Sequence, residues 1–114
     1  MSEYTRPPRA ADLEAEISAL PTCEGGRQRP FFSGYRANHD FHLPGEINDA
    51  QHEYLDGGKL EPGQTGKALL WLLGPERQKG RLYPGFEFTV QEGARLIGRG
   101  KITQVLNAEL RKDI

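Results

Sequence analysis

The chain has 114 residues, a formal net charge of −1, and 36% hydrophobic residues. This length suits one domain with a modest core. The balanced charge excludes a global field that attracts nucleic acid, so any contact with RNA needs a local basic patch. Fourteen glycines and eight prolines favour a turn-rich β fold over a helical bundle.

Cys23 is the only cysteine, which excludes an internal disulfide and is typical of a reducing compartment. The longest strongly apolar run, residues 68–73, is far too short to cross a bilayer. The N-terminus shows no apolar signal segment. We therefore expect a cytoplasmic protein with no membrane partner.

The first third of the chain predicts an arm, a strand and a glycine-rich connection. Residues 1–11 are expected to form a loose arm or a short edge pairing. From Leu13 to Ala19 every second residue is apolar, the period of a half-buried strand, although Ala, Glu and Leu also favour a helix. A connection over 25–34 and a strand over 35–43 follow.

The middle of the chain is rich in turn signals. Residues 44–64 contain Pro-Gly, Asn-Asp and Gly-Gly pairs, so at most one short strand, around 52–55, fits between them. Residues 65–73 predict a strand that is buried on nearly both faces. Residues 76–83 predict an exposed basic loop.

A hairpin is predicted near the C-terminus. Apolar and polar residues alternate over 86–91, and a turn at 92–94 leads into a strand from Arg95 to about Leu106. The period places these residues of the last strand inward: Leu96, Gly98, Gly100, Ile102 and Leu106. Glycines on that side suit a tightly curved strand that another backbone approaches. The strands together predict a small, closed, all-β antiparallel barrel over residues 12–107, followed by a polar tail over 108–114.

The sequence favours no metal site, cofactor or catalytic group. Residues 61–68 lack the first glycine and the final Ser or Thr of a phosphate-binding loop. His39 and His42, three apart, point to opposite faces of a strand and have no second ligand pair. Cys23 has no neighbouring base. We expect a protein that is not an enzyme.

The arginine-rich connection is the candidate binding segment. Its planar cations suit phosphate oxygens, and its tyrosine suits a ribose or base. Further cations face outward on the last strand. The candidate residues from this pattern are Arg27, Arg29, Tyr35, Arg36, Arg95 and Arg99. Together they predict a phosphate-tracking patch, and an ordinary mixed-charge surface is an equal alternative.

Two motifs resemble a known family. Residues 24–36 read E-G-G-R-x-x-P-F-F-x-x-Y-R, which resembles the segment that opens the C-terminal (third) domain of translation elongation factor Tu. Residues 86–100 are similar to that family's F-x-I-R-E-G-G-R-T-V-G-A-G stretch. The resemblance covers roughly residues 10–107 and implies a six-stranded antiparallel barrel of the Greek-key type.

The resemblance also implies partners. In that family the domain grips the T-stem backbone of aminoacyl-tRNA and contacts the GTPase domain and the exchange factor. The matched positions near the T-stem are Arg36, Glu92 and Gly93. Because no GTPase domain is present in this sequence, we expect a stand-alone, diverged relative that binds no nucleotide by itself.

Two hypotheses about function follow. The first is a non-catalytic module that contacts structured, tRNA-like RNA through the arginine-rich connection. The alternative is a protein-interaction module that mimics or binds elongation factor Tu or its partners, including ribosome-associated proteins, without contact to RNA.

Overall fold

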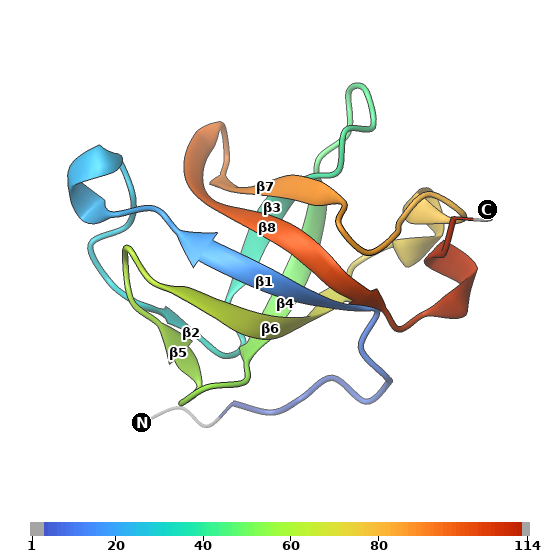
Figure 1. The fold of residues 1–114 in the computed structure, drawn as a ribbon, viewed down its shortest axis with the longest axis horizontal. Coiled ribbons are helices and arrows are strands. Elements are labelled where there is room, and N and C mark those ends of the chain that lie inside the picture. The colour runs from blue at the N-terminus through green and yellow to red at the C-terminus, as the bar shows by residue number, and fades with distance from the viewer. Residues whose placement is uncertain (1–3, 113–114) are drawn as a thin grey trace.

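The computed structural model describes residues 4–112, and its main feature is a closed barrel (Figure 1). The barrel strands follow the order β1-β6-β4-β3-β7-β8, and every neighbouring pair is antiparallel. Their bounds are β1 (Leu13–Ala19), β3 (Arg36–Asp40), β4 (Asn48–Tyr54), β6 (Thr65–Leu72), β7 (Glu87–Glu92) and β8 (Arg95–Val105). Since β3, β4 and β6 are sequential neighbours and β1 returns beside β6, the topology is a Greek key. The predicted closed, six-stranded antiparallel barrel is confirmed.

Short elements decorate the barrel. Strands β2 (Phe31–Phe32) and β5 (Lys59–Leu60) form a two-stranded ribbon. Single 3₁₀ turns occupy η1 (Thr22–Glu24), η2 (Pro75–Gln78) and η3 (Ala108–Leu110). Within residues 4–112, no helix is long and apolar enough to cross a membrane.

Strand β1 shows the predicted alternation. Its odd-numbered residues are buried, and Glu16 between them is exposed. The competing helix does not form, because the strand completes the barrel by pairing with both β6 and β8. In β6, Trp71 lies on the outer face, where its Nε1 donates to the Arg9 carbonyl at 2.8 Å. The described part of the N-terminal arm, residues 4–11, therefore covers the outer face of β6 at Trp71. Residues 1–3 of the predicted arm lie outside the described part.

The prediction for β4 was wrong in extent. The strand spans seven residues, from Asn48 to Tyr54, where the sequence suggested a short piece around 52–55. Its inward positions include Asn48, Ala50 and His52. Because two of these residues are polar, the sequence does not show the apolar alternation that identifies a strand. Asn48 was read as part of a turn, yet its side chain accepts a hydrogen bond from the buried Gln78. Asn48 of β4 and Gln78 of η2 thus form a buried polar pair.

The predicted inward face of β8 was wrong at both ends. Leu106 is 44% exposed and Leu96 is partly exposed, whereas Ile97 is fully buried. The pairing explains the change, since the register shifts between Val90 and Gln91 of β7 and again opposite β1. Each bulge adds one residue to β8 and reverses the alternation beyond it.

The inward glycines of β8 are confirmed and have two different causes. A methyl carbon on Gly98 would lie 2.9 Å from the Ser18 carbonyl oxygen, so another backbone fills the space. A methyl carbon on Gly100 would overlap the ring of Phe88, so here an aromatic side chain needs the room. Both glycines allow close approach to β8 from inside the barrel.

The predicted loop and tail pack against each other at one end of the barrel. Leu82 N donates to the Leu110 carbonyl and Lys112 N donates to the Leu82 carbonyl, both at 2.8 Å. Leu82 and Leu110 are at most 1% exposed. The segment predicted as a polar tail therefore contributes a core residue within its described part, because Leu110 seals this end. Residues 113–114 of that tail lie outside the described residues.

Candidate functional site

A shallow groove of about 300 Å³ lies beside the arginine-rich connection, on the outer surface of β3 and β7. Four residues predicted from the sequence line it: Tyr35, Arg36, Glu92 and Gly93. The rest of its wall includes the hydrogen-bonding side chains of Asn38, Asp49 and Gln91. The outward positions of β3 and β7 face this groove because the inward positions fill the barrel core.

Arg27, Phe31, Tyr35 and Glu92 form one compact group, here named the Arg27 cluster. The Tyr35 ring stacks on Phe31 with centroids 5.1 Å apart, and the Arg27 guanidinium lies 4.5 Å from the Tyr35 centroid. The Tyr35 hydroxyl donates to Glu92 Oε2, and Arg27 Nε lies 3.4 Å from the same oxygen. Burial, followed by the Glu92 carboxylate, raises the pKa of Tyr35 above its ordinary value. The cluster thus joins the connection to the β7–β8 turn.

Arg95 fixes the glycines of the connection. Its guanidinium donates to the Gly25 carbonyl at 3.1 and 3.2 Å and to the Gly26 carbonyl at 2.8 Å. Gly25 has a φ of 96°, and a side chain at Gly26 would overlap the Leu20 carbonyl, so both positions require glycine. The Arg95 guanidinium is therefore engaged within the protein and positions the connection.

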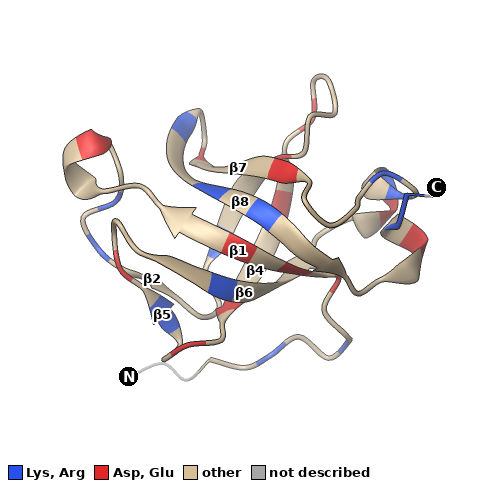
Figure 2. Cartoon of the chain, in the orientation of Figure 1, with Lys and Arg blue, Asp and Glu red and all other residues tan. Residues whose placement is uncertain are grey.

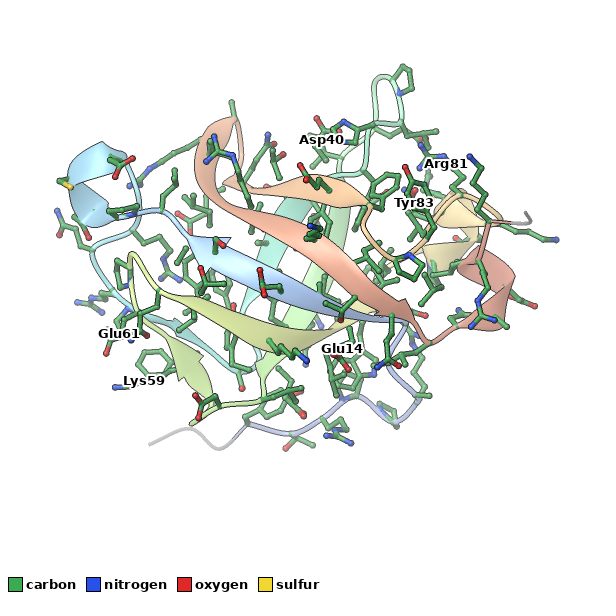
Figure 3. The ribbon with its side chains drawn as sticks, in the orientation of Figure 1. Glu14, Asp40, Lys59, Glu61, Arg81 and Tyr83 are labelled. Atoms are coloured by element: carbon green, nitrogen blue, oxygen red, sulfur yellow. The ribbon has the colours of Figure 1, made fainter. Side chains whose placement is uncertain are left out.

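Arg29 and Arg36 differ from these two arginines. Both are exposed, and within residues 4–112 neither lies within 4.0 Å of a carboxylate oxygen. Arg36 Nε donates a long hydrogen bond to Gln51 Oε1, at 3.5 Å. By contrast, Lys59 Nζ pairs with Glu61 at 3.1 Å on the small ribbon (Figure 3). Among the described residues, the charges of Arg29 and Arg36 are therefore not neutralised by an ion pair.

Arg99 lies apart from the groove, on the outer face of β8. It faces Ser18 on β1 and Thr89 on β7, and it lines a different groove of about 360 Å³. The adjacent row alternates in charge across four strands, as Figure 2 shows, and runs Lys67, Glu16, Lys101 and Glu87. The structure thus brings together six predicted residues of the connection and the β7–β8 turn, namely Arg27, Tyr35, Arg36, Glu92, Gly93 and Arg95. Arg99 lies apart from them, and Arg29 makes no contact with them within residues 4–112.

Asn38 was missed by sequence reasoning. Its Oδ1 accepts from the Gly93 amide at 2.9 Å, and its Nδ2 donates to Asp49 Oδ1 at 2.6 Å. It therefore holds the β7–β8 turn against β3 and β4. The sequence feature that could have identified Asn38 was its outward position on the predicted strand 35–43.

The two histidines considered as metal ligands are separated. His39 is fully buried inside the barrel, whereas His42 is exposed and its Nε2 lies 2.9 Å from the Glu87 carbonyl. Among residues 4–112, no group of three or more His, Cys, Asp or Glu residues is placed to hold a metal ion.

No protein-family model matches this chain, so the likeness to the third domain of elongation factor Tu stays a prediction based on the two motifs.

Proposed function

We propose that this chain is a non-catalytic binding module that contacts structured RNA along the β3–β7 groove. The observation that carries the proposal is the placement of Arg29 and Arg36. Both are exposed and lack a carboxylate partner within residues 4–112, and Arg36 lines a groove with polar walls. Guanidinium groups suit phosphate oxygens, and amide side chains suit the ribose 2′-hydroxyl.

The other arginines support the proposal as positioning residues. Arg27 and Arg95 hold the connection against the β7–β8 turn, so the cations of the connection are presented from an ordered backbone. Such pre-organisation lowers the entropy cost of binding. Arg36, Glu92 and Gly93 are also the positions that the resemblance places near the T-stem.

Binding of the full chain to a fluorescently labelled tRNA-like hairpin tests the proposal by anisotropy. We expect Arg29→Ala/Arg36→Ala to weaken binding and to make the salt dependence shallower by about 0.7–0.9 in log–log slope for each lost phosphate contact. Lys79→Ala is the matched control, because Lys79 is an exposed cation just after η2, at the opposite end of the barrel from η1 in Figure 1. Unchanged affinity in the double variant, or a flat salt response of the native chain, contradicts the proposal.

A second candidate is a protein-interaction module that mimics or binds elongation factor Tu or its partners. The favouring observation is that Ile47 and Leu73, 49% and 43% exposed, line one groove of about 430 Å³, which is separate from the β3–β7 groove. Apolar side chains exposed together mark protein contacts. Pull-down of elongation factor Tu that survives nuclease, and that Leu73→Asp abolishes, supports this candidate. Recovery lost with nuclease supports the RNA proposal instead.

A further inference from the structure

Two histidines lie inside the barrel and contact each other directly. His39 of β3 and His52 of β4 are both fully buried, and their Nε2 atoms are 2.7 Å apart. His39 Nδ1 lies 3.2 Å from the Asn48 carbonyl oxygen, and His52 Nδ1 lies 2.8 Å from the Tyr54 hydroxyl. The four groups form one hydrogen-bonded chain, here named the histidine chain.

Only one placement of protons satisfies the histidine chain. The Asn48 carbonyl can only accept, so His39 carries its proton on Nδ1, and its Nε2 is an acceptor. His52 must then donate from Nε2, which leaves its Nδ1 to accept from the Tyr54 hydroxyl. Both imidazoles are neutral in this arrangement, and each nitrogen has a partner.

An added proton breaks this arrangement. On His39 it places an N–H on Nε2, directly against the N–H of His52, so that two donors meet. On His52 it places an N–H on Nδ1, against the hydroxyl hydrogen of Tyr54. Either change needs a neighbouring group to reverse its donor and acceptor roles inside a packed core.

The surroundings offer little to stabilise an imidazolium. The groups around the pair are Phe41 just after β3, Tyr54 and Asp49 from β4, Phe88 from β7, and Tyr35 from the turn before β3. Asp49 is the charged group among them, and its side chain lies on the outer surface with Asn38. Burial lowers the pKa of His39 to about 4 and holds the pKa of His52 well below its ordinary value.

We propose that the histidine chain is an acid-sensitive lock on the β3–β4 hairpin. The hairpin is closed while both imidazoles are neutral, and it opens when acid supplies a proton. The lock lies directly beneath the Arg27 cluster, because the Tyr35 ring meets the His52 ring edge-on at 6.4 Å and the His52 amide donates to the Tyr35 carbonyl at 2.9 Å. Acidification therefore also loosens the residues that line the β3–β7 groove.

The direction of the effect follows from linkage. The histidines of the opened chain bind protons near the ordinary histidine pKa of about 6.5, whereas those of the closed barrel do not. The stability of the closed state relative to the opened state is therefore fully present above that pH and falls as the pH drops below it. Each histidine contributes about a tenfold change in the opening constant per pH unit. This slope is reached only well below the pKa, so two histidines between pH 6.5 and 5.0 together give a change of about 250-fold in the opening constant.

Nitrogen-15 NMR of the histidine rings in the full chain tests the lock directly. At pH 7.5 we expect His39 with its proton on Nδ1 and His52 with its proton on Nε2, and neither ring should titrate near pH 6.5. The opposite tautomer at either ring, or titration of both near 6.5, overturns the proposal.

Urea unfolding between pH 6.5 and 5.0 provides the second measurement. His39→Leu/His52→Leu/Tyr54→Phe removes the side chains of the whole polar chain. The unfolding constant of this variant should change far less over this range than the change of about 250-fold expected for the native protein. His42→Gln is the matched control, since His42 is the remaining histidine of the sequence and is exposed. It should keep the native dependence. A folded triple variant with undiminished acid sensitivity refutes the lock, and the ring tautomers decide the question if that variant does not fold.

Discussion

Gly100→Ala should destabilise the barrel through one identifiable overlap. A methyl carbon at this position would overlap Cζ and Cε2 of Phe88 and lie 2.8 Å from Cε1, where carbon atoms normally keep 3.5–4.0 Å. Phe88 is 2% exposed, and its ring lies 4.9 Å from that of Phe41 and 5.8 Å from that of His39. The ring therefore cannot swing aside without moving two other buried rings.

The expected loss is about 1–2 kcal/mol in the free energy of unfolding. Overpacking a core typically costs about 1–3 kcal/mol, and replacing glycine offsets about 0.4–1 kcal/mol by restricting the unfolded chain. Phe88→Leu should relieve the clash because leucine lacks the overlapping ring atoms. In the double variant, the two losses should fall short of additivity by about 1–2 kcal/mol.

Urea unfolding followed by the fluorescence of Trp71, the only tryptophan, measures each variant. Gln104→Ala is the control, because Gln104 is an exposed residue of the same strand, and it should change stability by less than about 0.5 kcal/mol. Native stability in Gly100→Ala, or strictly additive losses with Phe88→Leu, would show that the glycine is not there to make room for the ring.

Three further predictions concern other contacts of the barrel. Asp12→Ala should lower the free energy of unfolding, measured by urea unfolding, by about 3 kcal/mol. The Asp12 carboxylate is fully buried and accepts a hydrogen bond from the Leu72 amide at 2.8 Å, so the substitution leaves that amide without its acceptor. Arg95→Lys should speed amide exchange in residues 22–30, since an ammonium cannot replace the fork that bonds two carbonyls; unchanged exchange there would argue against this role. Burial raises the pKa of Tyr54, so stability present below pH 10 falls as pH rises above it, and Tyr54→Phe should make that fall less steep in urea midpoints from pH 9 to 11.

The strands whose inward residues are apolar could be predicted from the sequence. Residues 13–19 and 86–91 alternate because one face fills the barrel, and a period of two carries that information locally. The sequence could not predict which residues of β8 point inward at its two ends. The bulges that decide this arise from pairing with β7 and β1, and the residues of β8 themselves do not indicate them. Long-range register, not local propensity, decides which leucine points inward.

The prediction of the extent of β4 was wrong for a related reason. Because the strand was predicted too short, the histidine chain was missed as well. Asn48 and His52 occupy inward positions, where polar residues need partners from distant segments. The same-side spacing of His52 and Tyr54 becomes visible only when β4 is recognised as a long strand. A strand that carries a buried polar network is therefore hard to predict from the sequence, because polar residues occupy the inward positions where alternating apolar residues would identify a strand.

The contacts between the two motifs separate structural residues from residues that need a partner. Segments 24–36 and 86–100 touch in space through Arg95 and the glycine carbonyls, and through the Arg27 cluster. The glycines, the tyrosine and two of the arginines are thus accounted for by holding the connection on the β7–β8 turn. Arg29 and Arg36 receive no such account from residues 4–112. Because folding accounts for the glycines, the tyrosine and the other two arginines, these two cations are where a binding function must be tested.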